Sequence, residues 1–272
     1  MIFDFSNYSE LLPLVTNSLI VGALLAVVGG LIGVFVISRD MSFAVHGISE
    51  LSFAGASITL LIGGNVVFGS VVGSLVAAII IGILGAKAKE RNSITAVLMP
   101  FGLGLGILAL SLYEGRASNK FGLLTGQIVA VDDPQLVSIS ILASIVVVAL
   151  LIVWRPLTFA SIDSEVAAAR GVSTRTLSVL FMVLLGLAVA ASIQVVGALL
   201  VLSLLVTPAA AAVRVSRSPF VIPLLSVVFA LVSVIGGILL ALGSSLPISP
   251  FVTSISFLIY LVCRSVEWVR SR

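Results

Sequence analysis

The chain has 272 residues, of which 60% are hydrophobic and 9% are charged, and its formal net charge is +3. Soluble domains carry roughly a quarter of charged residues, so this composition excludes a water-soluble fold. A helix needs about 20 apolar residues to cross roughly 30 Å of hydrocarbon, and such stretches fill nearly the whole chain. We therefore expect one all-α, polytopic transmembrane domain over residues 1–272, in contact with membrane lipid and not with nucleic acid.

Charges, glycines, prolines and asparagines divide the apolar sequence into candidate helices. The spans predicted in the first part of the chain are Leu14–Ser38, Ser42–Ile62, Val66–Ala86 and Ser93–Tyr113. A polar loop, Glu114–Pro134, follows them, and the next predicted span is Gln135–Trp154. Asp132 and Asp133 in this loop could receive a cation, but we favour their solvation or the docking of a binding protein.

The second half of the chain contains a charged interruption and one overlong apolar run. Arg155–Arg175 is too charged to span and predicts a helix at the membrane surface. Leu177–Val213 would measure about 55 Å as one helix, so we divide it near Gln194 and Gly197. The last predicted spans, Phe220–Leu242 and Phe251–Val269, flank the turn 243–247. This division predicts nine crossings, or eight if the long run crosses once with a re-entrant piece.

The distribution of Lys and Arg predicts the orientation, because these residues are retained on the cytoplasmic side. With the N-terminus outside, only Arg116 and Lys120 of the fourteen Lys and Arg residues lie outside. We therefore expect a multi-pass protein of the cell membrane with a cytoplasmic C-terminus. The segment Met1–Leu12 lacks Lys and Arg, and we interpret it as mature sequence and not as a signal peptide.

One ionisable pair lies deep in a predicted span. Glu50 is near the middle of the second span, and His46, the only histidine, precedes it by one helical turn, which places both on one face. Ionisable groups at that depth usually face a transport path or a partner, and imidazole with carboxylate suits Zn²⁺ or Mn²⁺. Alternatively, the pair bonds internally, or to Ser49 and Ser52, and only ties helices together. The spacing leaves both interpretations open.

The sequence offers little for enzymatic chemistry. Cys263 is the only cysteine, and no second histidine could complete a catalytic zinc site. The chain also contains no G-x-x-x-x-G-K-[ST] loop for ATP hydrolysis. We therefore expect no permanently bound cofactor, and any ATP-driven cycle requires a separate ATPase subunit.

A short helix is predicted between Ser161 and Val172. Ser161 or Asp163 can cap its start, Glu165 lies in its first turn, and Arg170 and Gly171 close it. Its alanines form a flat surface that suits the docking of a protein, whereas the alternative is an interfacial helix on lipid headgroups.

These features together resemble the permease subunits of the zinc and manganese ABC importers, the ABC-3 metal transporter family, over almost the full length. The family pattern G-D-A-[IL]-S-H-[AS]-V-L-P-G is similar to Val45–Gly55, where Ser49 and Gly55 keep their places. The Asp of the pattern falls on His46 and its His falls on Glu50, so the order of the pair is exchanged. Ala54 stands where the pattern has Pro.

Three further segments carry the resemblance. Gln194–Ala211 is similar to the pattern Q-x-V-G…L-x-P-A-A, and Leu246–Pro250 to the turn L-P-S-G. The family's coupling helix, which sits in a groove of the ATPase, has the pattern D-x-E-x-A-x-x-x-G and is expected within about 157–175. The residues that match it or close it are Asp163, Glu165, Ala169, Arg170 and Gly171.

The resemblance implies a permease subunit that translocates a divalent transition metal ion by alternating access, zinc first and manganese second, with His46 and Glu50 holding the ion transiently. It also implies three kinds of partner: cytoplasmic ABC ATPase subunits, an extracytoplasmic metal-binding protein and a second permease copy, expected in a homodimer. The alternative is a secondary carrier, coupled to protons or ions, in which Glu50 exchanges protons and no ATPase takes part.

Overall fold

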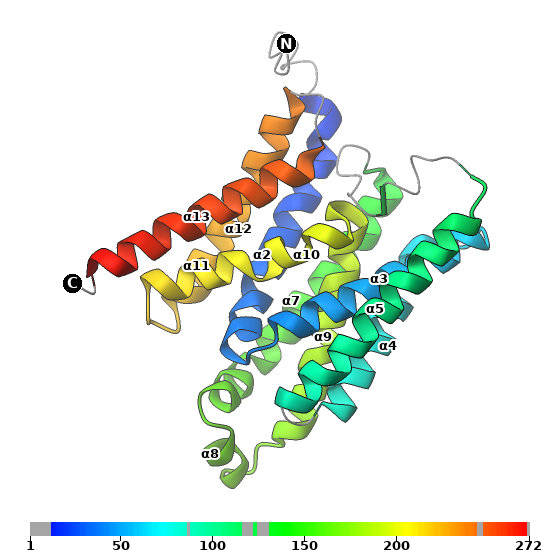
Figure 1. Cartoon of the computed structure of the whole chain (residues 1–272). Coiled ribbons are helices and arrows are strands. Elements are labelled where there is room, and N and C mark those ends of the chain that lie inside the picture. The colour runs from blue at the N-terminus through cyan, green and yellow to red at the C-terminus, as the bar shows by residue number, and fades with distance from the viewer. Residues whose placement is uncertain (1–11, 86–87, 116–121, 124–130, 244–246, 271–272) are drawn as a thin grey trace.

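The computed structural model describes residues 12–85, 88–115, 122–123, 131–243 and 247–270, which form helices and no strand (Figure 1). Eight of these helices are long and apolar enough to cross a membrane, which confirms the predicted all-α polytopic architecture. Three predicted features lie outside the described residues: the N-terminal segment 1–11, most of the loop that holds Arg116 and Lys120, and turn residues 244–246.

The first four spans agree closely with the sequence prediction. The observed elements are the short 3₁₀ helix η1 (Leu12–Val15), α2 (Thr16–Ser38), α3 (Ser42–Leu61), α4 (Val66–Leu84) and α5 (Ala88–Leu112). The predicted start of the fourth span at Ser93 is wrong, because α5 begins before Lys89, Glu90 and Arg91. Lys, Glu and Arg are good helix formers, and Arg91 donates from Nη2 to the carbonyl oxygens of Arg39 and Asp40 at 3.2 and 3.0 Å.

The segment after the fifth span differs from the prediction. Helix α7 (Asp133–Ile162) continues past Trp154, so Arg155–Arg175 is not one surface segment. The helix continues because Leu157 and Ala160 extend its buried face beyond the single exposed Arg155, and Pro156 interrupts it at only one backbone position. Only α8 (Ser164–Ala169) forms a separate short helix before α9 (Thr174–Val196).

The long apolar run Leu177–Val213, which begins within α9, is divided as the sequence predicts. Gly197 ends α9 with a φ of 78°, a conformation that glycine adopts without a steric penalty. The chain continues through the 3₁₀ helix η3 (Ala198–Leu200), α10 (Val201–Leu205) and α11 (Thr207–Val215). This broken helix is shorter than the eight full spans and takes the place of the predicted ninth crossing. Helices α12 (Val221–Leu242) and α13 (Ile248–Arg270) complete the described chain.

The helices pack in two groups that α9 connects (Figure 1). Helix α3 packs tightly against α4 and α5, whereas α2 packs mainly against α12 and α7, and α9 contacts both groups. Glycines permit the closest approach: a β-carbon at Gly55 or Gly73 of the α3–α4 interface would collide with backbone of the other helix. In a membrane, such small-residue contacts are a main source of helix association. The arrangement encloses α3 within the bundle.

Candidate functional site

His46 and Glu50 lie on one face of α3, as predicted, and their side chains approach each other. His46 Nε2 is 3.6 Å from Glu50 Oε1, which is longer than a hydrogen bond. The Glu50 side chain is only 5% exposed, whereas that of His46 is 29% exposed. The second atom of each group, Glu50 Oε2 and His46 Nδ1, is buried without a hydrogen-bond partner among the described residues. The imidazole and the carboxylate thus lie side by side inside the bundle, and each keeps one polar atom without a hydrogen-bond partner among the described residues.

The neighbouring serines form their hydrogen bonds with residues other than His46 and Glu50. Ser49 Oγ donates to the carbonyl oxygen of Ala198 at 3.1 Å, and Ser52 Oγ bonds Ser70 on α4 at 2.7 Å. The alternative interpretation from the sequence was that the pair bonds internally or to these serines. In the structure the serine hydroxyls bond to other helices, so the part of that alternative that involves Ser49 and Ser52 is not observed.

Helix α5 covers the pair from one side. A β-carbon at Gly102 would lie 2.9 Å from both the carbonyl carbon of Glu50 and the backbone nitrogen of Leu51. A β-carbon at Gly47 would lie 2.6 Å from Thr95 Cγ2, also on α5. The α5 backbone therefore rests directly on α3 at the level of Glu50, and the absence of these two side chains makes that contact possible.

The broken backbone after α9 lies on another side of the site. The hydrogen bond from Ser49 joins α3 to η3 immediately beside Glu50. Irregular backbone at membrane depth is tolerated where it is buried in protein or lines a cavity, and carbonyls of unwound helices commonly coordinate cations. The contact of Ser49 with Ala198 thus places irregular backbone against α3 next to the residue that precedes Glu50.

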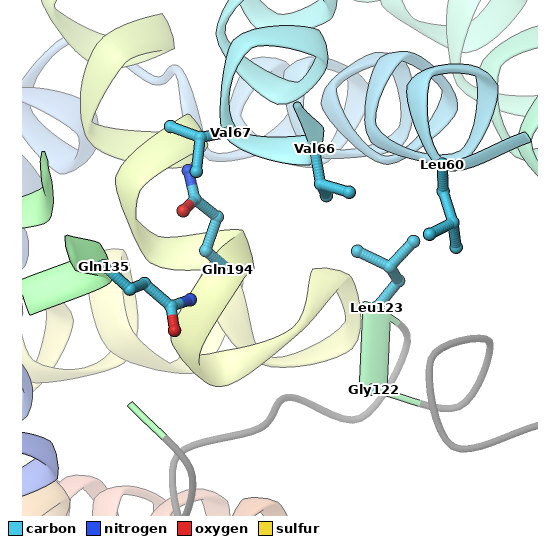
Figure 2. A pocket seen from close by; sticks show the side chains of 7 residues that line it. All are labelled: Leu60, Val66, Val67, Gly122, Leu123, Gln135 and Gln194. Atoms are coloured by element: carbon cyan, nitrogen blue, oxygen red, sulfur yellow. The ribbon is translucent and has the colours of Figure 1, made fainter. Parts of the chain in front are cut away.

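A cavity of about 250 Å³ opens beyond the far end of α3 (Figure 2). We call it the glutamine cavity, because Gln135 of α7 and Gln194 of α9 bring their amides to it among apolar residues. Its lining consists of Leu60, Val66, Val67, Gly122, Leu123, Gln135 and Gln194. The Oε1 atom of Gln194 is buried and has no hydrogen-bond partner in the described part of the chain.

An apolar cluster lies beside the glutamine cavity. Phe53, one turn beyond Glu50 on α3, is fully buried and packs with the buried residues Leu110, Leu123 and Ala198, and Leu60 packs against them. Leu60 and Leu123 also line the cavity, so the cluster forms its floor. Neither His46 nor Glu50 lines this cavity.

Two further buried polar residues, Ser57 and Gln194, were not singled out as functional by the sequence analysis. Ser57 lies seven residues after Glu50, hence on the same face of α3, and its Oγ is buried without a partner among the described residues. The seven-residue spacing from Glu50 was the feature of the sequence that could have indicated this position. Gln194 served to divide the long run and opened the segment that resembles the family pattern Q-x-V-G, but no local signal indicates that its amide faces a cavity.

The described residues contain no group of three or more His, Cys, Asp and Glu side chains that could hold a metal ion. Structural zinc sites have four protein ligands and catalytic sites usually three. A pair of side chains therefore suits an ion that binds and leaves, and not one that is stored.

The predicted coupling residues gather at one end of the bundle, where α8 projects (Figure 1). Asp163 Oδ1 accepts hydrogen bonds from the backbone nitrogens of Glu165 and Val166, each at 3.0 Å, which confirms its capping role. Arg170 follows as the C-terminal cap, and Gly171 has a φ of 86°. Only Ala167 of α8 is buried, so the predicted coupling residues, including Glu165 and Ala169, form an exposed surface.

The structure assigns packing roles to the two loop aspartates. Asp132 caps α7 by accepting from the backbone nitrogen of Gln135 at 2.8 Å. Asp133 Oδ1 accepts from Asn17 Nδ2 at 2.9 Å and so joins α7 to α2. Both carboxylates therefore hold the ends of helices in place.

Comparison with known proteins shows which family this chain matches and which relatives it resembles. The family model described as ABC 3 transport family matches residues 12–267. The manganese import system permease protein ScaB of Streptococcus parasanguinis is 30% identical over 252 residues, which are 92% of this chain and 88% of ScaB. The high-affinity zinc uptake system membrane protein ZnuB of Haemophilus influenzae is 27% identical over 225 residues, which are 82% of this chain and 86% of ZnuB.

A solved structure shares the fold. The structure described as PsaBC from Streptococcus pneumoniae in complex with Fab superimposes with a TM-score of 0.84 at 25% sequence identity. The match covers 94% of this chain and 95% of that chain. The complete helical arrangement is therefore common to both proteins.

Proposed function

Because this chain belongs to the ABC 3 transport family, we propose that it is the membrane-spanning permease subunit of an ATP-driven importer for a divalent transition metal ion. The His46–Glu50 pair is the observation that carries the proposal. A nearly buried carboxylate, one oxygen of which has no hydrogen-bond partner among the described residues, lies beside an imidazole in the middle of a span. Burying such a group is costly unless a cation or partner compensates it, so its presence indicates a transport path.

The transported ion is Zn²⁺ or Mn²⁺. Relatives that carry the names of manganese and zinc transport systems support this pair of metals, and nitrogen with oxygen ligands suits both. His46 and Glu50 bind the ion, and backbone oxygens near Ala198 add ligands. The small number of side-chain ligands permits release on the other side.

The cycle follows alternating access between two sides. The N-terminus lies outside and the C-terminus lies in the cytoplasm, and a binding protein delivers the ion at the end that carries the glutamine cavity. Separation of Phe53 from Leu123 and Ala198 opens a passage to Glu50. Cytoplasmic ATPase subunits hydrolyse ATP and receive α8, and a second permease copy completes the assembly.

The contacts of α8 suggest how a movement caused by ATP hydrolysis is transmitted to the ion-binding residues. Helix α8 is joined to α7 and α9, and α9 packs against both α3 and α4. A displacement of α8 by the ATPase therefore moves α9 against α3, which carries His46 and Glu50. The same displacement moves the broken backbone after Gly197.

The test is uptake of radioactive Zn²⁺ and Mn²⁺ into cells that express this chain with its ATPase and binding protein. We expect Glu50→Gln and His46→Ala to abolish ATP-dependent uptake of one or both metals at an unchanged membrane level. Glu267→Gln serves as the matched control, because Glu267 is a partly exposed carboxylate of α13 outside the site.

Uptake that survives both substitutions would refute the assignment of the site. The secondary carrier is distinguished by replacing the ATPase with a variant that cannot hydrolyse ATP. Uptake driven by a proton gradient under that condition would refute the importer, whereas loss of uptake in every background except the intact ATPase would support it.

A further inference from the structure

A second cavity, of about 400 Å³, lies at the end of the bundle that carries α8. We call it the arginine cavity, because Arg39, Arg91 and Arg175 line it together with the hydroxyl residues Ser164, Thr174 and Ser178. These residues come from the α2–α3 turn, α5, α8 and α9. Its volume falls in the range of roughly 300–1,000 Å³ that is typical of small-ligand sites. None of its lining residues belongs to the His46–Glu50 site.

Arg91 is the most deeply buried cation of the cavity. The residue is 7% exposed, and its Nη2 donates to the carbonyl oxygens of Arg39 and Asp40. Its Nε is buried and has no hydrogen-bond partner among the described residues. Native structures rarely leave a buried charged donor unpaired, because the lost hydration is not replaced.

Arg39 shows the same incomplete pairing. Its Nη2 donates to Ser178 Oγ at 3.2 Å, and its guanidinium lies 5.6 Å from the centre of the Phe181 ring. Its Nη1 is buried without a partner within the described residues. Burial, and secondarily the neighbouring Arg91, lower the pKa of Arg39, which reflects the cost of bringing two like charges together.

No carboxylate of the described chain compensates the two guanidiniums directly. Glu50 pairs with His46, and Glu267 pairs with Arg214 and Arg264, so these two carboxylates are engaged away from Arg39 and Arg91. The carboxylate of Asp40 attracts Arg91 through space, but the described hydrogen bonds of Arg91 reach only the Asp40 backbone. The cavity therefore gathers three arginines, and two of their nitrogens, Arg39 Nη1 and Arg91 Nε, are buried without a hydrogen-bond partner among the described residues.

We propose that the arginine cavity binds a phosphate oxyanion, supplied either by a lipid headgroup or by free phosphate. Guanidinium groups donate in a planar fork that matches phosphate oxygens. Phosphate offers more acceptor oxygens and more charge than a carboxylate, which suits several converging cations and hydroxyl groups. Arg175, exposed at the start of α9, and Ser164, at the start of α8, complete the lining.

The bound phosphate joins elements of both helix groups. Arg39 follows α2, Arg91 belongs to α5, and Ser164 and Thr174 begin the two helices next to the coupling surface. A shared anion bridges them and stabilises the end of the bundle at which α8 projects. Through this site, the lipid composition of the membrane or the phosphate concentration affects the stability of the permease.

The test uses thermal unfolding of the full-length protein in detergent, followed with a dye that reacts with thiols. Cys263 is the only cysteine and is 5% exposed, so its reaction reports unfolding. Inorganic phosphate is titrated against chloride at equal ionic strength. We expect the unfolding midpoint to rise by a few degrees for each tenfold increase in phosphate beyond half-saturation, because a ligand of the folded state stabilises it.

The second arm compares bilayer discs of anionic phosphatidylglycerol with discs of phosphatidylcholine, whose choline offsets the phosphate charge. Arg39→Gln and Arg175→Gln are expected to lose at least half of the stabilisation. Arg175 is exposed and forms no hydrogen bond within the described residues, so its variant tests the cavity even if Arg39→Gln does not fold. Arg217→Gln is the matched control, since Arg217 is an exposed arginine outside the cavity.

Each outcome decides the proposal. A rise with inorganic phosphate that depends on Arg175 supports a site for free phosphate, and a rise only in phosphatidylglycerol supports a headgroup site. No rise in either arm, or a rise of equal size in the Arg175→Gln and Arg217→Gln variants, would overturn it. Because the readout is stability, this result is independent of whether the chain transports metal.

Discussion

Replacing Gly102 by alanine tests how closely helix packing controls the position of Glu50. The new β-carbon would lie 2.7 Å from Leu51 Cδ1 and 2.9 Å from the Glu50 carbonyl carbon and the Leu51 nitrogen. Gly104 lies two residues further along α5 and is exposed, and a β-carbon there would meet no atom within 4 Å, so Gly104→Ala is the control. Both substitutions change the helix propensity of α5 equally, and only Gly102→Ala introduces the collision.

The contact distances set the expected size of the effect. Ordinary contacts of a β-carbon begin at 3.4 Å, so α3 must retreat from α5 by about 0.5 Å to relieve the backbone contacts. Inserting a methyl group into a packed interface costs about 1–3 kcal/mol. Relative to Gly104→Ala, we therefore expect Gly102→Ala to raise the unfolded fraction by about fivefold to 150-fold.

The measurement is the exposure of Cys263 to a thiol-reactive dye in each variant, together with metal uptake at equal membrane levels. We expect lower stability and lower uptake for Gly102→Ala and wild-type uptake for Gly104→Ala. Equal stability of the two variants would refute the close contact of α5 with Glu50. Lower stability with unchanged uptake would show that the position of Glu50 tolerates the displacement.

Two further substitutions test separate elements of the fold. Asp163→Ala removes the N-terminal cap of α8 and should destabilise that helix by about 0.5–2 kcal/mol. Hydrogen exchange at the Glu165 amide should become roughly two- to thirtyfold faster. An unchanged exchange rate would contradict the capping role. Ser52→Ala removes the hydrogen bond to Ser70 between α3 and α4 and should cost about 0.6–2 kcal/mol in the Cys263 assay. The exposed Ser254 provides the control, and equal effects of the two alanine substitutions would contradict a contribution from the buried bond.

The helices whose ends are marked by local chemistry were predictable from the sequence. Gly197 adopts a positive φ, Asp163 caps α8, and the overlong apolar run had to break because a bilayer has a fixed thickness. The errors arise where charge was equated with the end of a helix. Arg155 ends the apolar run but not α7, because a helix can continue into the aqueous phase while its other face stays buried.

The approach of His46 and Glu50 to each other was predictable because both residues belong to one helix. The spacing of His46 and Glu50 determines that they share a face, whatever surrounds them. The contact of Ala198 with Ser49 and the position of Gln194 at a cavity depend on how α9 and η3 pack against α3, and no pattern within those segments encodes that packing. The arginine cavity was missed for the same reason, since its three arginines are far apart in the sequence.

The order of the pair has a physical consequence for transport. Helix α3 runs from the arginine cavity toward the glutamine cavity, so His46 lies nearer the α8 end and Glu50 lies one turn deeper. In the family pattern the carboxylate precedes the histidine, and here the deeper and more buried position carries the carboxylate. A carboxylate at that position loses most of its hydration, and a cation beside it would compensate that loss. Under the proposed function, relief of the buried charge favours ion binding, and the more exposed imidazole lies on the side toward which an imported ion leaves.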